Sequence, residues 1–141
     1  MQFELLEETF TNEKSKEEIP GVTIIIDGDL KRVLDTIIKL DPSYISYTGI
    51  IANAIVKGIN KASLIYTNDE LTIFEEDLCN EKTTQKVKGI RIMIIGKLKA
   101  LLERQISSGE FRSYSEVIGD DLKIGLNDVI AVCKNRMVQN G

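Results

Sequence analysis

The sequence predicts an α+β protein built from two tandem strand–helix–helix units that pair with each other inside one chain. Two short runs of β-branched residues have the composition of half-buried strands, and each run precedes two helices with a single apolar stripe. The two sets also align with each other. Because a lone strand is marginally stable, we expect a two-stranded antiparallel ribbon with four helices over one face.

This pattern divides the 141 residues into five segments, and 43% hydrophobic content is enough for one shared core. We expect an acidic N-terminal arm at residues 1–18, a first unit at 19–62, a connection at 63–86, a second unit at 87–134 and a C-terminal tail at 135–141.

The first unit starts after the turn-forming pair at residues 20–21, with the strand VTIIID. Apolar residues then recur at helical spacing from Leu30 to Ile38. Pro42 ends this helix, because the residue before a proline is disfavoured in a helix. Ser46 is the expected N-cap of the second helix, which begins near Tyr47.

The second unit repeats this order. KGIRIMI at residues 88–94 alternates as a strand does, and a helix follows until the stop at residues 108–109. Ser113 and Glu116 have the spacing of a capping box, in which the serine oxygen accepts from a first-turn amide and the glutamate reaches back. The last helix buries a stripe that ends at Cys133.

Two segments are less determined. Residues 1–18 are acidic with scattered apolar side chains, and we expect a loose arm, with a short packed helix as the alternative. In the connection, LIY and LTIF are separated by the turn-forming pair at residues 68–69. They could pair as a small hairpin, or residues 70–78 could form a short helix; both remain open.

The internal repeat is the strongest signal in the chain. Residues 45–61 align without gaps with residues 112–128, and Gly58 matches Gly125 in the middle of each second helix. Glycine in a helix interior costs roughly 1 kcal/mol relative to alanine. Its recurrence therefore predicts a close approach of the two helices across a pseudo-two-fold axis.

The residue types argue against an enzyme. The chain has no histidine, which is the usual general acid or base and the commonest metal ligand. Cys79 and Cys133 are too far apart for a metal knuckle. We therefore expect no catalytic residue, cofactor or metal. We also expect a cytoplasmic protein, because no apolar run approaches the roughly 18 residues of a membrane span and the N-terminus is not a secretory signal.

The second half closely resembles the ribbon-helix-helix (MetJ/Arc-like) family of small DNA-binding repressors and antitoxins, over IRIMIIGKLKALLERQISSGEFRSYSEVIGDDLKIGL. The first half matches in pattern but departs at Gly49, where the family often has glutamate. Among tandem members, the chain is most similar to archaeal-virus transcription regulators, which would place it in the host-cell cytoplasm. The resemblance implies a sequence-specific transcription regulator, a repressor or an activator, that binds double-stranded DNA as a homodimer.

In that family the ribbon enters the major groove, whose base edges are distinguishable. If alternate strand residues face the core, the other face carries the base-contacting candidates. Arg91 could bind guanine through two hydrogen bonds, and Thr23 could contact a thymine methyl. The full set of base-contacting candidates is Gly21, Thr23, Ile25, Gly89, Arg91 and Met93.

The resemblance also implies phosphate contacts where the second helices begin, since free amides and the helix dipole bind phosphate there. These candidates are Ser46, Tyr47, Thr48, Ser113, Tyr114 and Ser115, together with Lys31, Lys88 and Lys97 near the ribbon ends. The charge balance suits DNA less well, because the net charge is −4 and the basic residues gather at 82–104. The alternative is a protein-interaction module, antitoxin-like or an assembly factor, whose ribbon no longer reads DNA.

Overall fold

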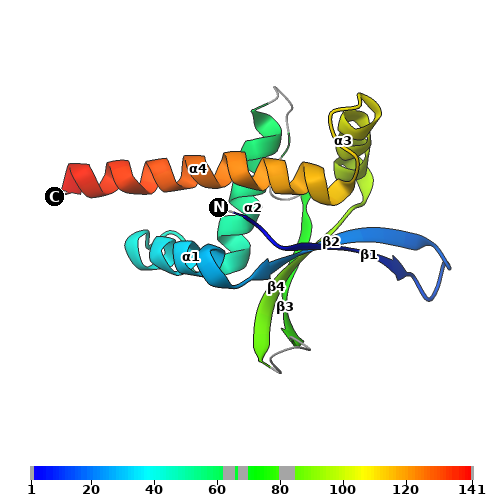
Figure 1. Cartoon of the computed structure of the whole chain (residues 1–141), viewed down its shortest axis with the longest axis horizontal. Coiled ribbons are helices and arrows are strands. Elements are labelled where there is room, and N and C mark those ends of the chain that lie inside the picture. Colours follow the sequence, from blue (N-terminus) through cyan, green and yellow to red (C-terminus); the bar gives the residue numbers. More distant parts are fainter. Residues whose placement is uncertain (1, 62–65, 67–69, 80–84, 141) are drawn as a thin grey trace.

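The computed structural model describes residues 2–61, 66, 70–79 and 85–140, and it forms an α+β fold with helices on one face of an antiparallel sheet (Figure 1). In chain order the elements are β1 (Leu5–Thr11), β2 (Glu18–Ile26), α1 (Gly28–Leu40), α2 (Tyr47–Asn60), β3 (Thr72–Cys79), β4 (Lys86–Met93), α3 (Gly96–Ser107) and α4 (Tyr114–Asn140).

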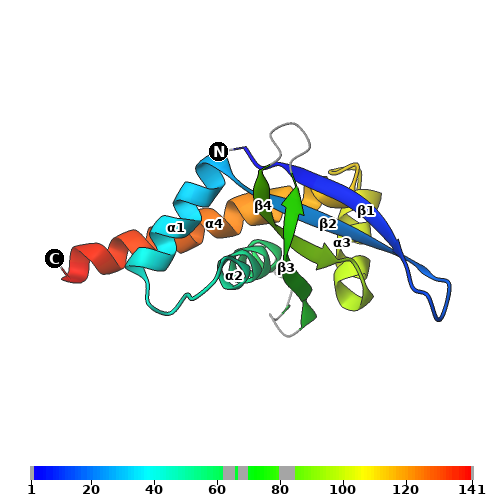
Figure 2. The ribbon, with the colours of Figure 1, turned by 90° about the horizontal axis from the view of Figure 1, so that it is seen from below.

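The two predicted strands are the central pair of the sheet, whose order is β1-β2-β4-β3. β2 and β4 run antiparallel with Thr23 opposite Arg91 and Ile24 opposite Ile90, so the predicted pairing is confirmed. The prediction of a two-stranded sheet is wrong, because β1 adds to the outer edge of β2 and β3 to the outer edge of β4. Figure 2, seen from below, shows strands of the sheet in front of α4, with α1 and α2 to one side.

Both flanking strands are antiparallel hairpin partners of the strand that follows them. β1 pairs with β2 from Leu5 opposite Ile24 to Thr11 opposite Glu18, so the prediction of a loose arm is wrong for these residues. β3 pairs with β4 over its whole length, which decides for a strand rather than a helix at residues 72–79. The predicted LIY run falls partly on residues 64–65, outside the described residues.

The helix boundaries follow the predicted signals closely. α1 ends at Leu40 before Pro42, and α2 begins after Ser46, whose Oγ accepts a hydrogen bond from the Gly49 N–H at 3.2 Å. α4 continues to Asn140, so a tail beginning at 135 is wrong for residues 135–140. No helix in the described ranges is long and apolar enough to cross a membrane.

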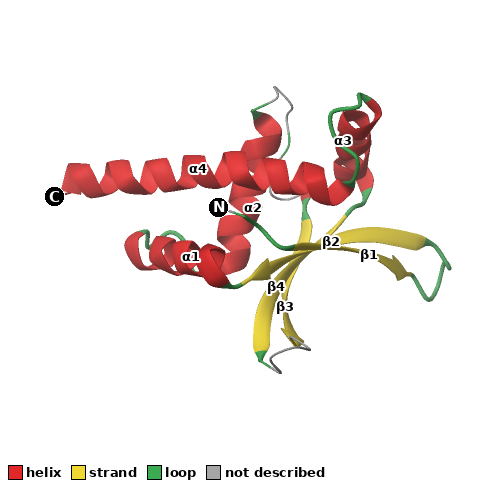
Figure 3. Cartoon of the chain, in the orientation of Figure 1, coloured by secondary structure: helices red, strands yellow, loops and turns green. Residues whose placement is uncertain are grey.

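The core lies between the sheet and the four helices (Figure 3). Alternate residues of the two central strands are completely buried under the helices; they include Val22, Ile24, Ile90 and Ile92. α2 and α4 cross above this layer (Figure 1). A Cβ added at Gly58 would lie 2.0 Å from the Asp121 carbonyl oxygen, and one at Gly125 would lie 1.5 Å from the Ala54 carbonyl oxygen. The close helix approach predicted from these two glycines is confirmed.

Candidate functional site

The face of the sheet turned away from the helices carries all six residues predicted to contact bases. Gly21 pairs with Met93, Thr23 with Arg91 and Ile25 with Gly89. Residues directly opposite each other in an antiparallel pair share one face of the sheet. The central strands therefore gather these six residues on one surface, which we call the outer sheet face.

The flanking strands cover most of this surface. Thr23 is 1% exposed and Ile25 is 7% exposed, and Gly21 and Gly89 are also buried. A Cβ at Gly21 would lie 2.8 Å from the Phe10 ring of β1, and one at Gly89 would lie 2.6 Å from the Leu78 side chain of β3. Four of the six candidates are therefore buried in this arrangement, and only Arg91 and Met93 are partly exposed.

Arg91 is enclosed by side chains from both flanking strands. Its guanidinium lies 3.3 Å from a Glu8 carboxylate oxygen and 2.7 Å from a Glu76 carboxylate oxygen. The Phe10 ring centre is 4.3 Å from the guanidinium carbon, and the Phe74 ring centre is 5.7 Å away. Its side chain is 19% exposed. Two carboxylates of the same chain therefore already neutralise its charge, and two aromatic rings already lie against the guanidinium.

Most of the side chains predicted to contact phosphate at the start of α2 make hydrogen bonds within the chain instead. Ser46 is the N-cap, and Thr48 is half-buried in the first turn. The Tyr47 hydroxyl donates to Asp35, which also binds the Lys31 ammonium at 2.9 Å. These two hydrogen bonds hold the pKa of the Asp35 carboxyl below its usual range.

The start of α4 holds a carboxylate from β1. The Glu116 N–H donates to Ser113 Oγ at 3.3 Å, as the capping box predicted, and the Glu116 carboxylate reaches back to the Arg112 N–H at 3.2 Å, one residue before the cap. The Ser115 N–H donates to the Glu7 carboxylate at 3.1 Å, where a phosphate was predicted. Burial and a hydrogen bond to Glu103 raise the pKa of the Tyr114 phenol to about 12.

The remaining predicted phosphate contacts are lysines, and each is also paired with an acid of the chain. Lys88 lies 2.6 Å from Asp77, and Lys97 lies 3.5 Å from Glu70. Together with Lys31 and Arg91, all four cations assigned to DNA have a carboxylate within 4 Å. The acids on Arg91, Lys88 and the α4 N-terminus come from β1, which was predicted as a loose arm, and from β3, for which a strand and a helix were both left open.

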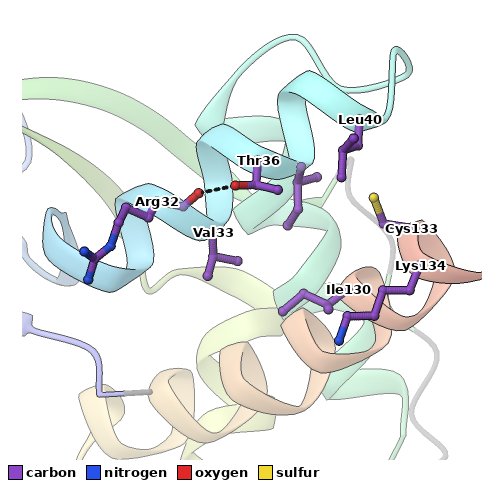
Figure 4. A pocket seen from close by; sticks show the side chains of 8 residues that line it. Arg32, Val33, Thr36, Leu40, Ile130, Cys133 and Lys134 are labelled. Atoms are coloured by element: carbon purple, nitrogen blue, oxygen red, sulfur yellow. Dashed lines mark hydrogen bonds between the residues drawn. The ribbon is translucent and has the colours of Figure 1, made fainter. Parts of the chain in front are cut away.

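A second surface is the apolar groove between α1 and the C-terminal half of α4 (Figure 4). Its volume is about 300 Å³, and its walls are Val33, Ile37 and Leu40 on α1 and Ile130 and Cys133 on α4; Arg32, Thr36 and Lys134 complete the lining. The groove exists because α4 has 27 residues and α2 only 14, so α4 extends along α1 beyond the crossing.

Neither this groove nor the cover over the outer sheet face was predicted from the sequence. The signal for the groove was the continuation of the α4 apolar stripe through Val129 and Cys133, which are both buried. No cluster of three or more potential metal ligands occurs among the described residues. In comparisons with protein-family models, with curated proteins and with solved structures, nothing matches this chain.

Proposed function

We propose that the chain is a protein-interaction module that binds a partner in the α1–α4 groove, with the paired units as its scaffold. One observation carries this proposal: the four cations that would bind DNA are each paired with a carboxylate of the same chain. DNA affinity depends on cations that neutralise phosphates and release counterions. Cations already paired within the chain supply little of that driving force.

The groove favours a partner segment that carries an apolar side chain beside acidic ones. Its walls are aliphatic, and Leu40 at its edge is 42% exposed. Lys134 stands on the α4 wall, whereas Arg32 on the α1 wall is already bound to the Asp29 carboxylate of the same helix. Apolar anchors in a pocket with a complementary charged rim are the usual energetic centre of a helix-in-groove interface.

A site-specific photo-crosslinker at Leu40 tests the proposal and identifies the partner for reconstitution from purified components. With that partner, Leu40→Asp should weaken binding about tenfold or more, because a carboxylate would enter an apolar contact beside an acidic partner. Phe74→Ala, on the outer sheet face, is the matched control and should leave the affinity unchanged. Equal affinity of Leu40→Asp and the unchanged chain would refute the groove as the docking site.

The second candidate function is sequence-specific DNA binding by a transcription regulator of the ribbon-helix-helix kind. The observation that favours it is the register of β2 and β4, which puts the six base-contacting candidates on one face. A two-stranded ribbon suits a major groove about 12 Å wide. Four strands at about 4.8 Å spacing are too wide, so β1 and β3 would have to move aside.

Binding to the DNA upstream of its own coding sequence tests this candidate. Log affinity should fall steeply with log salt concentration, and Arg91→Ala and Thr23→Ala should weaken binding. Glu7→Gln, Glu8→Gln and Glu76→Gln combined should strengthen it, with Glu13→Gln, in the turn between β1 and β2, as the control. A regulator of this kind would act as a homodimer, which sedimentation on the promoter fragment would detect. Absence of salt-dependent binding by the triple variant would exclude this candidate.

A further inference from the structure

The α2–α4 crossing holds a buried carboxylate that the core does not need. The repeat places Ala54 and Asp121 at matching positions, each with its backbone against the glycine of the other helix. Ala54 is completely buried and apolar, whereas Asp121 is 4% exposed and carries a carboxyl group into the same kind of contact. An alanine at this position is therefore enough for the two helices to cross. Only the second unit carries a carboxylate there.

Within the described part of the chain, this carboxylate has no compensating partner. Its Oδ2 atom is buried and makes no hydrogen bond to any residue that the structure describes. Burial, with a smaller contribution from the neighbouring Asp120, raises the pKa of the Asp121 carboxyl to about 7. A buried polar group without a partner destabilises the fold, so its presence calls for an explanation outside the core.

Asp121 also lines a cavity of about 250 Å³ where the ends of α2 and α3 meet α4. Two further carboxylates line it, Glu110 and Asp120, and the basic group in its wall is Lys61. The Lys61 ammonium is bound to Asp128 at 3.0 Å, so it does not neutralise Asp121. Apolar walls come from Phe111 and Ile124, and Gln105 contributes an amide. The cavity is therefore acidic, partly aromatic and large enough for about eight waters at roughly 30 Å³ each.

We propose that this cavity binds a short aliphatic diamine, with the Asp121 carboxylate as the buried partner of one ammonium group. Asp120 and Glu110 lie on the same cavity and would receive the second ammonium, and Phe111 adds an aromatic side chain to the wall. An organic ammonium fits better than a metal ion, because no cluster of potential metal ligands occurs in the described part of the chain. The site is separate from the α1–α4 groove and does not depend on the function proposed for it.

Isothermal titration calorimetry with 1,4-diaminobutane tests the proposal, with 1-aminobutane as the single-ammonium probe and 1,4-butanediol as the neutral one. We expect the diamine to bind more tightly than the monoamine and the diol not to bind. Asp121→Asn keeps the shape but removes the charge, and it should weaken the diamine at least about tenfold. Asp120→Asn should have a smaller effect, because Asp120 is exposed.

The melting temperature of Asp121→Asn separates an effect on binding from an effect on folding. Asp121→Asn removes a buried charge, so it should melt at the same or a higher temperature, and lost binding could not be attributed to unfolding. At about pH 6.5, diamine binding should release protons from Asp121, which appears as a buffer-dependent heat; Lys61, Glu110 and Asp120 are the other charged groups on the cavity. Equal diamine affinity in Asp121→Asn, or no binding of the diamine at millimolar concentration, would overturn the proposal.

Discussion

The two second helices, α2 and α4, share one contact and differ in almost everything around it. Each places a glycine against the backbone of the other at matching positions of the repeat. Away from that contact, α4 is 27 residues long against 14, carries Asp121 where α2 has Ala54, and begins against a carboxylate of β1. The repeat thus preserves the crossing, whereas the differences mark the groove, the acidic cavity and the covered outer sheet face.

Disrupting the glycine contact between α2 and α4 should change the free energy of unfolding more than any other substitution proposed below. Gly125→Ala places a methyl group 1.5 Å from the Ala54 carbonyl oxygen, so the helices must separate. We expect a loss of about 3 kcal/mol or more in the free energy of unfolding, measured by denaturant titration. Gly119→Ala is the control on the same helix, because its methyl would meet only Leu5 at 3.9 Å, and it should stabilise by about 0.5–1 kcal/mol. Similar effects of the two substitutions would contradict the close approach.

Replacing Asp121 by the residue of the other unit should stabilise the protein at high pH. The folded pKa of about 7 lies above the ordinary value of 3.8. The unfolded chain therefore ionises first as pH rises, and the protein loses stability between about pH 4 and pH 7. This difference between the folded and unfolded pKa of Asp121 corresponds to a loss of at most about 4 kcal/mol in the free energy of unfolding.

We expect Asp121→Ala to raise the free energy of unfolding by about 3 kcal/mol near pH 8 and to change it little below pH 4. Unfolding titrations at both pH values provide the measurement, with Asp120→Ala as the exposed neighbour. A constant difference across the pH range would show that the effect does not come from ionisation of Asp121.

The central strands and the helices could be predicted because their signals are local. Ile90 and Ile92 alternate with Gly89 and Arg91, and the caps at Ser46 and Ser113 each lie within one turn of the amide they bind. The two central strands also pair antiparallel, as the repeat predicted.

The cover over the outer sheet face could not be predicted in the same way. β1 and β3 both carry Glu or Asp, so the composition of β1 indicated a loose arm, and that of β3 did not decide between a hairpin strand and a helix. Their acids become structural only because hairpin pairing brings Glu8 and Glu76 onto Arg91 from opposite sides. That arrangement depends on register between strands, and it buries Thr23 and Ile25, which alternation alone placed toward the major groove.

The two carboxylates that bind Arg91 should contribute differently to the free energy of unfolding. Glu76 lies closer, at 2.7 Å against 3.3 Å for Glu8, and its side chain is 22% exposed against 38%. We expect Glu76→Gln to reduce the free energy of unfolding by about 1–2 kcal/mol and Glu8→Gln by about 0.5 kcal/mol, because solvent screens the second pair more. Thermal unfolding at low and high salt provides the measurement. A larger loss in Glu8→Gln would mean that β1, rather than β3, holds the arginine.

Removing the N-cap serine of α2 or of α4 should have the smallest effect on the free energy of unfolding. Ser46 Oγ accepts the Gly49 N–H, and Ser113 Oγ accepts the Glu116 N–H, at nearly equal distances of 3.2 and 3.3 Å. In α4, however, the Glu7 carboxylate accepts from the Ser115 N–H, and a negative charge also favours this end of the helix. Ser46→Ala should therefore cost about 1 kcal/mol in stability and Ser113→Ala about 0.5 kcal/mol.

If Glu7 is the reason for this difference, removing it should restore the full effect of the serine. In a Glu7→Gln background, Ser113→Ala should cost about 1 kcal/mol, as Ser46→Ala does, because α4 then depends on its own cap. A double-mutant cycle on the free energy of unfolding measures this coupling, and the same cycle with Ser46→Ala should be additive. Additivity in both cycles would show that the carboxylate of β1 does not stabilise the start of α4, and that the two helices begin in equivalent ways.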